Sequence, residues 1–445
     1  MNSNPTSEIN ISKETSSSID LVSKTFCTNE RISFGRRLKV ILRHFISRQF
    51  MLFCLILSTL AKWIGRKKLS FSEKGCVVML TGRFDSKNWI LAHLVPIANS
   101  KKCSRILMVS SNPVPSIQKV EAIYPPKWLI KVTGKTPARL LTFFWAAIRK
   151  KPHFVGGFHL LYNGIFAEII SYLVGARSIY FCIGGTEVDN QGVMDEPNCF
   201  KTTKAADNIL RKRRLKIVSR FDLIITMGTR AAKFLRKNGI NTTIKVVSGG
   251  IDTNRFHPGK ENPLIDIIFV ARLSIEKRLD IFLQAVKLVV DELPKTKVVI
   301  IGEGPLRNKL DKMLIKLSLD KNVDFMGHQD NVHEWLQQAK IFVLTSDLEG
   351  LALSVIEAMM SGLPVVVSDV GDLGDIVKHE VNGYLVPRRH PELFAKYLVD
   401  LLSNKKKLEA FGKTAIQSAK RYETQATSQK WDNIFESFQT FTKEK

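Results

Sequence analysis

Short apolar runs separated by helical stretches recur along the chain from about residue 74 onward. The first series reads CVVML, RILMVSS, HFVGGFH, SIYFCIGG and FDLIITMG, with helical patterns such as RLLTFFWAAIRK and GIFAEIISYLVG between them. Strands with one face in water alternate apolar and polar residues, whereas these runs are apolar almost throughout. They therefore predict a parallel sheet that helices cover on both faces.

A second series of the same kind follows, with the runs IDIIFVARL, KVVIIGEG, VDFMGHQ, IFVLTS and LPVVVSD. Two successive series of strands and helices predict an α/β chain with two doubly wound, Rossmann-like domains. The segment VSGGIDTNRFHPGKENPL between them is rich in Gly, Pro and Asn and lacks periodicity. It is predicted to link two domains that face each other across a ligand-binding cleft.

These patterns divide the chain into six predicted segments. They are a disordered tail at 1–30, a basic amphipathic membrane-interface segment at 31–72, an N-terminal domain at 73–248, a linker at 249–263, a C-terminal domain at 264–415 and a C-terminal helix at 416–445. The tail is assigned because Ser, Thr and Asn are frequent there. The last helix is amphipathic, and its sequence leaves open which domain it packs against.

Composition agrees with this division. A chain of 445 residues that is 44% hydrophobic and 24% charged is sufficient for two globular cores. Its six cysteines lie far apart and form no C-x-x-C pair. This spacing predicts a reduced compartment, with neither a disulfide framework nor a cysteine-based zinc site.

The net charge is concentrated in one half of the chain. Residues 1–250 contain 40 Lys and Arg against 14 Asp and Glu, whereas the remainder contains 27 of each kind. The whole excess of +26 therefore belongs to the N-terminal half. Such asymmetry predicts that this half faces an anionic surface, either a membrane or a nucleic acid.

The segment before residue 73 combines this charge with apolar residues. Between Glu30 and Glu73 there is no acidic residue, ten Lys and Arg occur, and the stretch 49–61 is uncharged. That stretch is shorter than the roughly 20 apolar residues of a membrane span. We predict a helix that lies in the membrane interface. A buried helix of a globular domain and a true span are the alternatives, so the relation of 41–64 to the membrane stays open.

Two cations follow the first strand of the second series. Arg272 ends the run IIFVAR, and Lys277 comes just before the next helix. A guanidinium, an ammonium and the free N–H groups of a helix start together suit an anion. The alternative is that both are solvated surface charges.

Two glycines follow the next strand, in IIGEGP. Gly302 and Gly304 have no Cβ, so a ligand can approach the backbone closely there. Many loops of this kind look alike, and the chain contains neither a G-x-G-x-x-G fingerprint nor a G-x-x-x-x-G-K-[ST] phosphate loop.

Two carboxylates occupy the stretch LTSDLEGLALSVIEAMMSGLPVVVSD. Glu349 lies in the loop after the strand IFVLTS, and Glu357 lies in the helix that follows. Carboxylates accept hydrogen bonds, so a pair at the cleft suits a polyhydroxylated ligand. The N–H groups of Gly350 and Leu351 suit a phosphate or a sugar hydroxyl.

Two alternatives apply to this stretch. In one, Glu349 caps the helix and Glu357 pairs with a lysine. In the other, the triplet 347–349 holds a divalent metal. The chain has no D-x-D sequence and no clustered histidines, which disfavours the metal.

Together these residues resemble those of the family 4 glycosyltransferases, the glycosyl transferases group 1, which are retaining enzymes with the GT-B fold. The similarity covers roughly 75–440 and is strongest over 246–387. GGIDTNRFHP is similar to the N-G-V-D-x-x-x-F-x-P of that family, ARLSIEKRLD to G-R-L-x-x-x-K-G, and GEGPLRNKL to G-x-G-P-x-x-x-x-L. EGLALSVIEAMMSGLPVVV is similar to E-G-x-x-x-x-x-x-E-A-M-A-x-G-x-P-V-V. Four such motifs in this order are highly specific.

The resemblance implies roles for the residues above. Arg272 and Lys277 would grip the donor diphosphate and form the catalytic group with Glu349, which would also hold the donor hexose. Glu357 would accept hydrogen bonds from the ribose, and the base would lie near Gly327. The donor-binding set that it implies comprises Gly82, Gly302, Gly304, Gly327, Gly350, Leu351 and Glu357.

The chain departs from the family pattern at four places, the first of which is Ala271, where the family usually has glycine before the arginine. Ala352 stands where the family often has proline, and the glycine-rich loop of the N-terminal domain is reduced to LTGRFDSKN, which leaves Gly82 as a phosphate neighbour. Where many members carry histidine at a strand end, this chain has CIGGTEVD. Thr186 or Glu187 is therefore assigned to the acceptor side, with a simple glycine turn as the alternative.

We therefore expect a retaining, metal-independent hexosyltransferase of polysaccharide biosynthesis, with a nucleotide-diphosphate sugar as donor and no cofactor. Its acceptor would be lipid-linked or a glycan, at an anionic membrane surface on the cytoplasmic face, with no nucleic-acid partner. The alternative from another class is a nucleic-acid- or membrane-binding scaffold on an inactive fold, which the basic run RKRRLK at 211–216 favours. A phosphorylase is a third possibility, but no lysine is singled out for pyridoxal phosphate.

Overall fold

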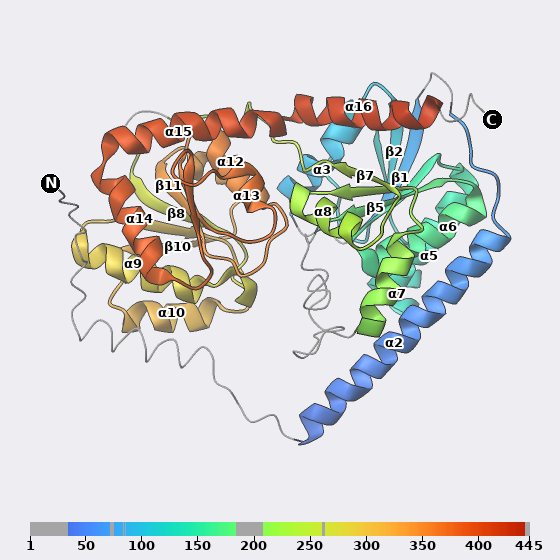
Figure 1. The fold of residues 1–445 in the computed structure, drawn as a ribbon, viewed down its shortest axis with the longest axis horizontal. Coiled ribbons are helices and arrows are strands. Elements are labelled where there is room, and N and C mark those ends of the chain that lie inside the picture. The colour runs from blue at the N-terminus through green and yellow to red at the C-terminus, as the bar shows by residue number, and fades with distance from the viewer. Residues whose placement is uncertain are drawn as a thin grey trace.

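The computed structural model describes residues 34–71, 75–82, 84, 86–183, 208–259 and 263–440. These residues form two parallel β-sheets, one in each half of the chain, each surrounded by helices (Figure 1). The predicted α/β class with two doubly wound units is confirmed. The predicted tail at 1–30 lies outside the described residues, as do Thr186 and Glu187.

The N-terminal sheet has seven strands in the order β3-β2-β1-β4-β5-β6-β7. They are β1 (Cys76–Thr81), β2 (Cys103–Val109), β3 (Val120–Ile123), β4 (Phe154–Phe158), β5 (Arg177–Cys182), β6 (Leu223–Thr226) and β7 (Thr243–Val246). The strand order reverses between β1 and β4. Open sheets of this type bind ligands beside that point, at the carboxyl ends of the strands.

Helices cover both faces of this sheet. They are α3 (Lys87–Asn99), α4 (Lys127–Thr133), α5 (Lys135–Lys150), the π-helical turn η1 (Leu160–Gly164), α6 (Ile165–Val174), α7 (Asn208–Val218) and α8 (Thr229–Lys237). On one face Val78 and Leu80 of β1 share a core with Leu94 of α3. On the other face Met79 shares a core with Phe143 of α5. Successive side chains of β1 thus point to opposite faces, and both faces are dry.

The C-terminal sheet has six strands in the order β10-β9-β8-β11-β12-β13. They are β8 (Ile265–Val270), β9 (Val298–Ile301), β10 (Val323–Gly327), β11 (Ala339–Leu344), β12 (Val365–Ser368) and β13 (Gly383–Val386). The helices are η3 (Ile275–Lys277), α9 (Leu279–Glu292), α10 (Arg307–Lys316), α11 (Val332–Leu336), α12 (Leu353–Met360), α13 (Leu373–Ile376), α14 (Pro391–Ser403), α15 (Lys405–Ala419) and η4 (Lys420–Tyr422). The strand order reverses between β8 and β11.

The last helix, α16 (Thr424–Thr440), returns to the N-terminal domain (Figure 1). Ser100 Oγ, just after α3, donates to Asp432 Oδ1 over 2.7 Å. The ring of Phe435 lies 5.3 Å from that of Phe154 in β4. The sequence left the partner of this helix open, and it packs on the N-terminal sheet. The predicted segment 416–445 begins inside α15 rather than at this helix.

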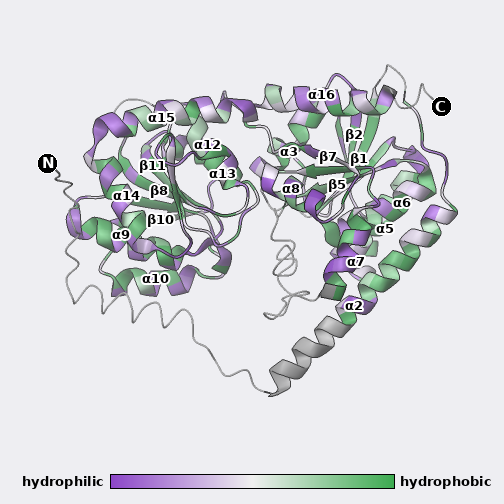
Figure 2. Cartoon of the chain, viewed as in Figure 1, coloured by the Kyte–Doolittle hydropathy of each residue, from purple (hydrophilic) through white to green (hydrophobic). Residues whose placement is uncertain are grey.

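The long helix α2 (Phe34–Trp63) lies along the outside of the N-terminal domain (Figure 1). Met51 and Leu55 are buried in a core shared with α7. Phe53 and Trp63, on the other side, are 55% and 85% exposed. Apolar residues therefore occur along the described part of α2 on both its buried and its outer side (Figure 2). In the described part of the chain, no helix is both long and apolar enough to span a membrane.

Polar contacts fix α2 and the segment after it to the domain. Ser58 Oγ donates to Glu168 Oε1 over 2.7 Å, and burial raises the pKa of Glu168 to about 7. Arg220 Nη2 donates to Thr59 Oγ1 over 2.9 Å. Each of these contacts joins residues more than 100 positions apart, so α2 belongs to the folded domain.

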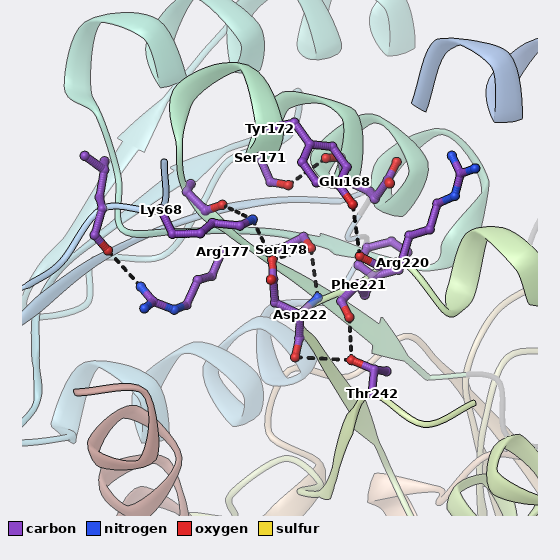
Figure 3. A network of polar contacts seen from close by, with 12 residues as sticks. Lys68, Glu168, Ser171, Tyr172, Arg177, Ser178, Arg220, Phe221, Asp222 and Thr242 are labelled. Carbon is purple, nitrogen blue, oxygen red and sulfur yellow. Dashed lines mark hydrogen bonds and ion pairs between the residues drawn. The ribbon is translucent and has the colours of Figure 1, made fainter. Parts of the chain in front are cut away.

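Further polar contacts join the segment after α2 to β5 and to Asp222 (Figure 3). Lys68 Nζ lies 2.8 Å from Asp222 Oδ2, which also accepts from the backbone N–H of Ser178 over 2.7 Å. Arg177 Nη1 donates to the carbonyl of Leu69 over 2.8 Å. A partly buried polar network of this kind favours one arrangement, because each unpaired buried member would be costly. It therefore fixes the segment after α2 to the domain.

Candidate functional site

An ion pair lies at the carboxyl edge of the C-terminal sheet. Lys277 ends η3, in the connection after β8, and Glu349 lies in the loop after the adjacent strand β11. Lys277 Nζ donates to Glu349 Oε1 over 2.6 Å, and the side chains are only 15% and 9% exposed. Ser346 Oγ donates to the same oxygen over 2.6 Å. No described residue donates to Glu349 Oε2, so that oxygen is left to accept from a ligand.

Arg272 lies on the same edge, two residues after β8. Its side chain is 79% exposed, and its ion pair with Glu276 spans 3.5 Å. Exposed pairs of this kind contribute little to stability, because water screens them and two long side chains lose freedom. The guanidinium is therefore accessible to an anion. The structure thus brings Lys277 and Glu349 together and leaves Arg272 exposed beside them.

Asp347, a member of the metal alternative, faces two arginines. Its Oδ2 accepts from Arg278 Nη1 over 3.1 Å and from Arg389 Nη2 over 2.7 Å. Burial acts to raise the pKa of Asp347, but the bonds from Arg389 and Arg278 outweigh it and hold that pKa below its usual value. Asp347 and Glu349 are thus neutralised by separate cations instead of converging on one point.

Glu357 is buried in α12, with 7% of its surface exposed. Burial raises the pKa of its carboxyl to about 7, and the positive charge of Arg255 acts in the opposite direction. Arg255 belongs to the connection between the domains and donates to Asn88 Oδ1 of α3 over 3.1 Å. No described side chain donates a hydrogen bond to Glu357, so the lysine partner of the alternative interpretation is not found among the described residues. The carboxyl oxygens of Glu357 can therefore accept hydrogen bonds from a ligand.

The backbone that lies close to the loop after β9 explains in part why glycine occupies positions 302 and 304. A Cβ on Gly302 would lie 1.9 Å from the carbonyl oxygen of Ala271, and one on Gly304 would lie 2.4 Å from that of Leu273. The loop therefore packs directly on the segment that carries Arg272. Gly327, at the end of β10, accepts from the Gly302 N–H over 2.8 Å. These glycines thus allow close backbone packing at the carboxyl edge of the sheet, where Arg272 and Lys277 lie.

The loop at 350–352 leads into α12. Its cap residue is Ala352, and no side chain caps the helix, so the cap by Glu349 that the alternative interpretation proposed is not formed. The first N–H groups of α12 remain open to a ligand oxygen. Behind the loop, a Cβ on Gly371 would lie 1.9 Å from the Glu349 carbonyl oxygen. The position of Glu349 is thus set by close backbone packing.

Gly82 does not join these residues. It follows β1 in the N-terminal domain and lines a cavity whose described walls all come from that domain. A Cβ at Gly82 would lie 2.3 Å from the ring of Phe84, so this glycine also permits a close approach within the domain.

Contacts between the domains meet at the start of α8. The backbone N–H of Arg230 donates to Asp372 Oδ1 over 2.7 Å, and that of Thr229 donates to Asp375 Oδ2 over 2.6 Å. Arg230 Nη2 also lies 2.7 Å from Asp369 Oδ1. Acids of the C-terminal domain thus cap a helix of the N-terminal domain. These contacts were not predicted from the sequence, because α8 and these acids are more than 130 positions apart.

Arg278 was also not singled out from the sequence. It occupies a left-handed conformation with φ 50° and pairs with Asp280 through Nε and Nη2 at 2.9 and 2.7 Å. The motif that ARLSIEKRLD resembles ends in K-G, so Arg278 stands where that motif has glycine. An arginine at a position where the motif has glycine was the feature of the sequence that could have drawn attention to Arg278.

Comparison with known families decides the identity of the second domain. Residues 250–418 match the family model described as Glycosyl transferases group 1. The C-terminal domain belongs to that family. The resemblance inferred from the motifs is therefore confirmed, and the matched region of this glycosyl transferases group 1 domain contains Arg272, Lys277, Glu349 and Glu357.

Two curated relatives are similar to part of the chain. The chain is 32% identical over 170 residues to the poly(ribitol-phosphate) alpha-N-acetylglucosaminyltransferase of Staphylococcus aureus, covering 38% of this chain and 34% of the relative. It is 28% identical over 178 residues to the UDP-Gal:alpha-D-GlcNAc-diphosphoundecaprenol alpha-1,3-galactosyltransferase of Escherichia coli, covering 36% and 46%. The aligned part thus spans less than half the length of each relative.

The solved structures extend the comparison to the fold of both domains. The crystal structure of Anabaena HepE with UDP-glucose superposes with a TM-score of 0.65 at 15% identity and covers 81% of this chain and all of that one. The structure of Staphylococcus aureus TarM has a TM-score of 0.56 at 22% identity and covers 67% and 58%. The fold is GT-B, as expected.

Proposed function

We propose that this protein is a retaining glycosyltransferase that moves a hexose from a nucleotide-diphosphate sugar to a membrane-associated, lipid-linked or glycan acceptor of polysaccharide biosynthesis. The observation that carries the proposal is the contact between Lys277 and Glu349 at the carboxyl edge of the C-terminal sheet, with Arg272 exposed beside it. A cation and an acid held together in one place suit a ligand that is both a diphosphate and a sugar.

The donor is proposed to lie along this edge. Lys277 has three N–H donors and uses one on Glu349, so it can contact the diphosphate while it holds the acid in place. Arg272 supplies a second cation. Glu349 Oε2 accepts hydrogen bonds from the hexose. The open N–H groups of Gly350 and Leu351 donate hydrogen bonds to it. Glu357, buried and near its pKa at neutral pH, accepts from the ribose.

The proposed chemistry relies on electrostatic stabilisation of the departing diphosphate. Charge develops on the phosphate as the glycosidic bond breaks, and preorganised cations stabilise that charge in the transition state. Lys277 and Arg272 serve this role without a metal ion or another cofactor. The departing phosphate then accepts the proton of the acceptor hydroxyl, so the reaction needs no protein nucleophile.

The acceptor side is assigned to the N-terminal domain at an anionic membrane surface on the cytoplasmic face. The whole excess charge of the chain lies in residues 1–250. The outer side of α2 adds exposed apolar residues, including Phe53, Ile56, Leu60 and Trp63. Basic residues near an apolar helix face are typical of interfacial binding. The assignment of Thr186 or Glu187 to the acceptor falls outside the described residues and remains a proposal.

The relatives support an acceptor of this kind. By name, the Staphylococcus aureus relative acts on poly(ribitol-phosphate), and the Escherichia coli relative acts on a diphosphoundecaprenol-linked sugar. The solved HepE structures contain UDP, UDP and glucose, or UDP-glucose. We extend the uridine nucleotide to this chain only as the first donor to test.

The alternative of a nucleic-acid-binding scaffold rested on the run 211–216 and the basic N-terminal half, and three arginines of that run contact the rest of the domain. Arg214 is 7% exposed. Arg213 donates to the carbonyl of Arg48 in α2, and Arg211 Nη2 donates to Asn238 Oδ1 over 2.9 Å. Three of its arginines therefore serve packing of the domain, so we do not favour this alternative.

A thermal-shift screen with UDP-, GDP- and dTDP-hexoses tests the proposal, followed by measurement of hexose transfer or hydrolysis for the donor that binds. A ligand that binds the folded state alone raises the melting temperature. We expect one nucleotide sugar to do so, and Lys277→Ala to lose that shift. Absence of both binding and turnover across the panel would overturn the proposal.

A further inference from the structure

A cavity of about 220 Å³ opens in the N-terminal domain, and the described residues that line it include Gly82 but none from the C-terminal domain, where Lys277 and Glu349 lie. It lies at the carboxyl ends of β1 and β2 and at the start of α5, beside the reversal of strand order. The described residues that line it are Gly82, Ser110, Ser111, Asn112, Lys135, Thr136 and Arg139. Two of these are basic, three carry hydroxyls and none is acidic.

The basic residues stand where a helix already carries positive charge. Lys135 is the first residue of α5 and Arg139 lies one turn later, so both lie on one side of the helix. The first turn of α5 has no acid, and its cap residue Gly134 provides no side-chain oxygen. Two cations at a helix N-terminus repel the helix dipole. An anion in the cavity would relieve this repulsion and accept from the open N–H groups.

The cavity is also held in shape by its own contacts. Arg139 is only 4% exposed, and its Nη2 donates to Asn163 Oδ1 over 2.7 Å. Ser111 Oγ donates to the Lys135 carbonyl over 3.1 Å, which joins the loop after β2 to the start of α5. This bond holds the Arg139 guanidinium beside the other residues that line the cavity. This arrangement is typical of phosphate recognition.

We propose that this cavity binds a phosphate group of the acceptor. The inference rests on the proposed function and names the acceptor as a phosphorylated molecule whose phosphate is held by Lys135, Arg139 and the N–H groups at the start of α5. Its volume is below the roughly 300 Å³ at which pockets for whole drug-sized ligands begin, so it suits a head group. The donor diphosphate has separate cations, Arg272 and Lys277, in the other domain.

The surroundings of the cavity indicate where the rest of the acceptor extends. Trp128 and Val132 of α4 and Trp145 of α5 are 66%, 77% and 58% exposed. These apolar residues lie on the helix that begins at the cavity and on the helix immediately before it. A phosphate that carries a hydrocarbon chain would place its charge in the cavity and its chain against these side chains. A soluble phosphorylated acceptor would use the cavity alone.

The first experiment measures pyrophosphate binding by titration calorimetry, in the presence and absence of UDP. The Lys277→Ala variant removes the proposed donor site, and we expect one pyrophosphate site to remain in it. Adding Lys135→Ala should weaken this remaining site about tenfold or more, because a hydrogen bond to a charged group is lost. Lys135 is exposed, so the variant should fold. Lys237→Ala, at an exposed lysine of α8, is the matched control and should bind like its parent.

Three results would overturn the inference: loss of all pyrophosphate binding in Lys277→Ala, competition by UDP for the remaining site, or no effect of Lys135→Ala. Competition by UDP would assign the cavity to the donor. The measurement needs no turnover, so a protein that binds pyrophosphate in the cavity but processes no nucleotide sugar would defeat the proposed function alone.

A second arm distinguishes the sources of the phosphate. Farnesyl phosphate and inorganic phosphate are compared on the full chain and on Trp128→Ser. Tighter binding of farnesyl phosphate that is reduced by Trp128→Ser supports a lipid phosphate. Equal binding of both probes supports a soluble phosphorylated acceptor, and binding of neither overturns the inference.

Discussion

The ammonium of Lys277 lies 2.6 Å from Glu349 Oε1, although the two residues are 72 positions apart in the chain. The connection after β8 supplies the cation and the loop after β11 supplies the acid, and these strands are neighbours in the sheet. Both side chains are largely buried, so neither is an ordinary solvated charge. The pair therefore positions each member for a ligand at the strand ends.

Removal of this cation should abolish most activity. Lys277→Ala should lower kcat by about 10²-fold or more, the usual effect of losing one group that stabilises transition-state charge. Lys340→Ala is the control, because it breaks a 2.7 Å pair with Asp266 at the opposite edge of the same sheet. Transfer rates with the donor found in the screen check this. Equal losses in both variants would mean that the effect is structural.

Glu357 should make stability depend on pH. Its pKa of about 7 in the folded protein exceeds the ordinary 4.5, so the folded state holds this proton more tightly than the unfolded state. The resulting stabilisation is complete below about pH 4.5 and is lost as the pH rises towards 7. Glu357→Gln stays neutral, so it should be more stable than wild type by about 2 kcal/mol at pH 8, with little difference near pH 5. Urea unfolding at both pH values measures this.

The same carboxyl should govern donor affinity. Glu357→Gln replaces a charged acceptor, so the donor KM should rise about tenfold at pH 8. In the wild type, KM should rise towards the variant's value as the pH falls below 7, because Glu357 becomes protonated. Glu292→Gln, at an exposed acid of α9, is the control. A wild-type KM that is flat between pH 6 and 8 would contradict the assignment.

Arg278 should be important for stability. Arg278→Ala leaves Asp280 and Asp347 without their buried partner, and we expect a loss of about 3 kcal/mol in the free energy of unfolding. Arg278→Gly should lose about 1 kcal/mol less than Arg278→Ala, because glycine adopts φ 50° without strain. Arg389→Ala removes an arginine that is 60% exposed and should cost under about 1 kcal/mol. Denaturant unfolding ranks the three variants, and an equal loss in all would contradict the prediction.

The cap that Asp372 places on α8 should hold the two domains together. Asp372→Ala removes the acceptor for the Arg230 and Ala231 N–H groups and should cost about 1 kcal/mol, as the loss of a helix cap usually does. The radius of gyration measured by X-ray scattering should increase as the domains separate more often. Asp372→Asn keeps a capping oxygen and should behave nearly as the wild type. An unchanged radius in Asp372→Ala would argue that other contacts hold the domains.

The outer side of α2 should bind anionic membranes. Phe53 and Trp63 are exposed, so changing both to serine should reduce co-sedimentation with phosphatidylglycerol vesicles while leaving the fold unchanged. Leu264→Ser with Ile315→Ser changes two exposed apolar residues of the C-terminal domain and is the control. Binding of the wild type should fall with salt. Equal recovery of the wild type with neutral and anionic vesicles would contradict the prediction.

Local patterns were sufficient to predict both sheets and the sheet edge that carries Lys277 and Glu349. A run such as IIFVAR indicates a buried strand because its neighbours in sequence are also its neighbours in the strand. The cation after β8 and the acid after β11 then fall at the same sheet edge, because parallel strands end together. The motifs predicted the family by the same local reasoning.

The sequence by itself determined the two α/β units, the family of the second and the residues at its strand ends, because these follow from spacing along the chain. Only the tertiary structure decided that α16 returns to the first domain, that α2 packs by one face, and that Asp372 caps α8. It also placed Lys135 and Arg139 around one cavity with the loop after β2. These features join residues that are distant in sequence, and such contacts depend on how the sheets and helices pack in space, which short-range periodicity does not encode.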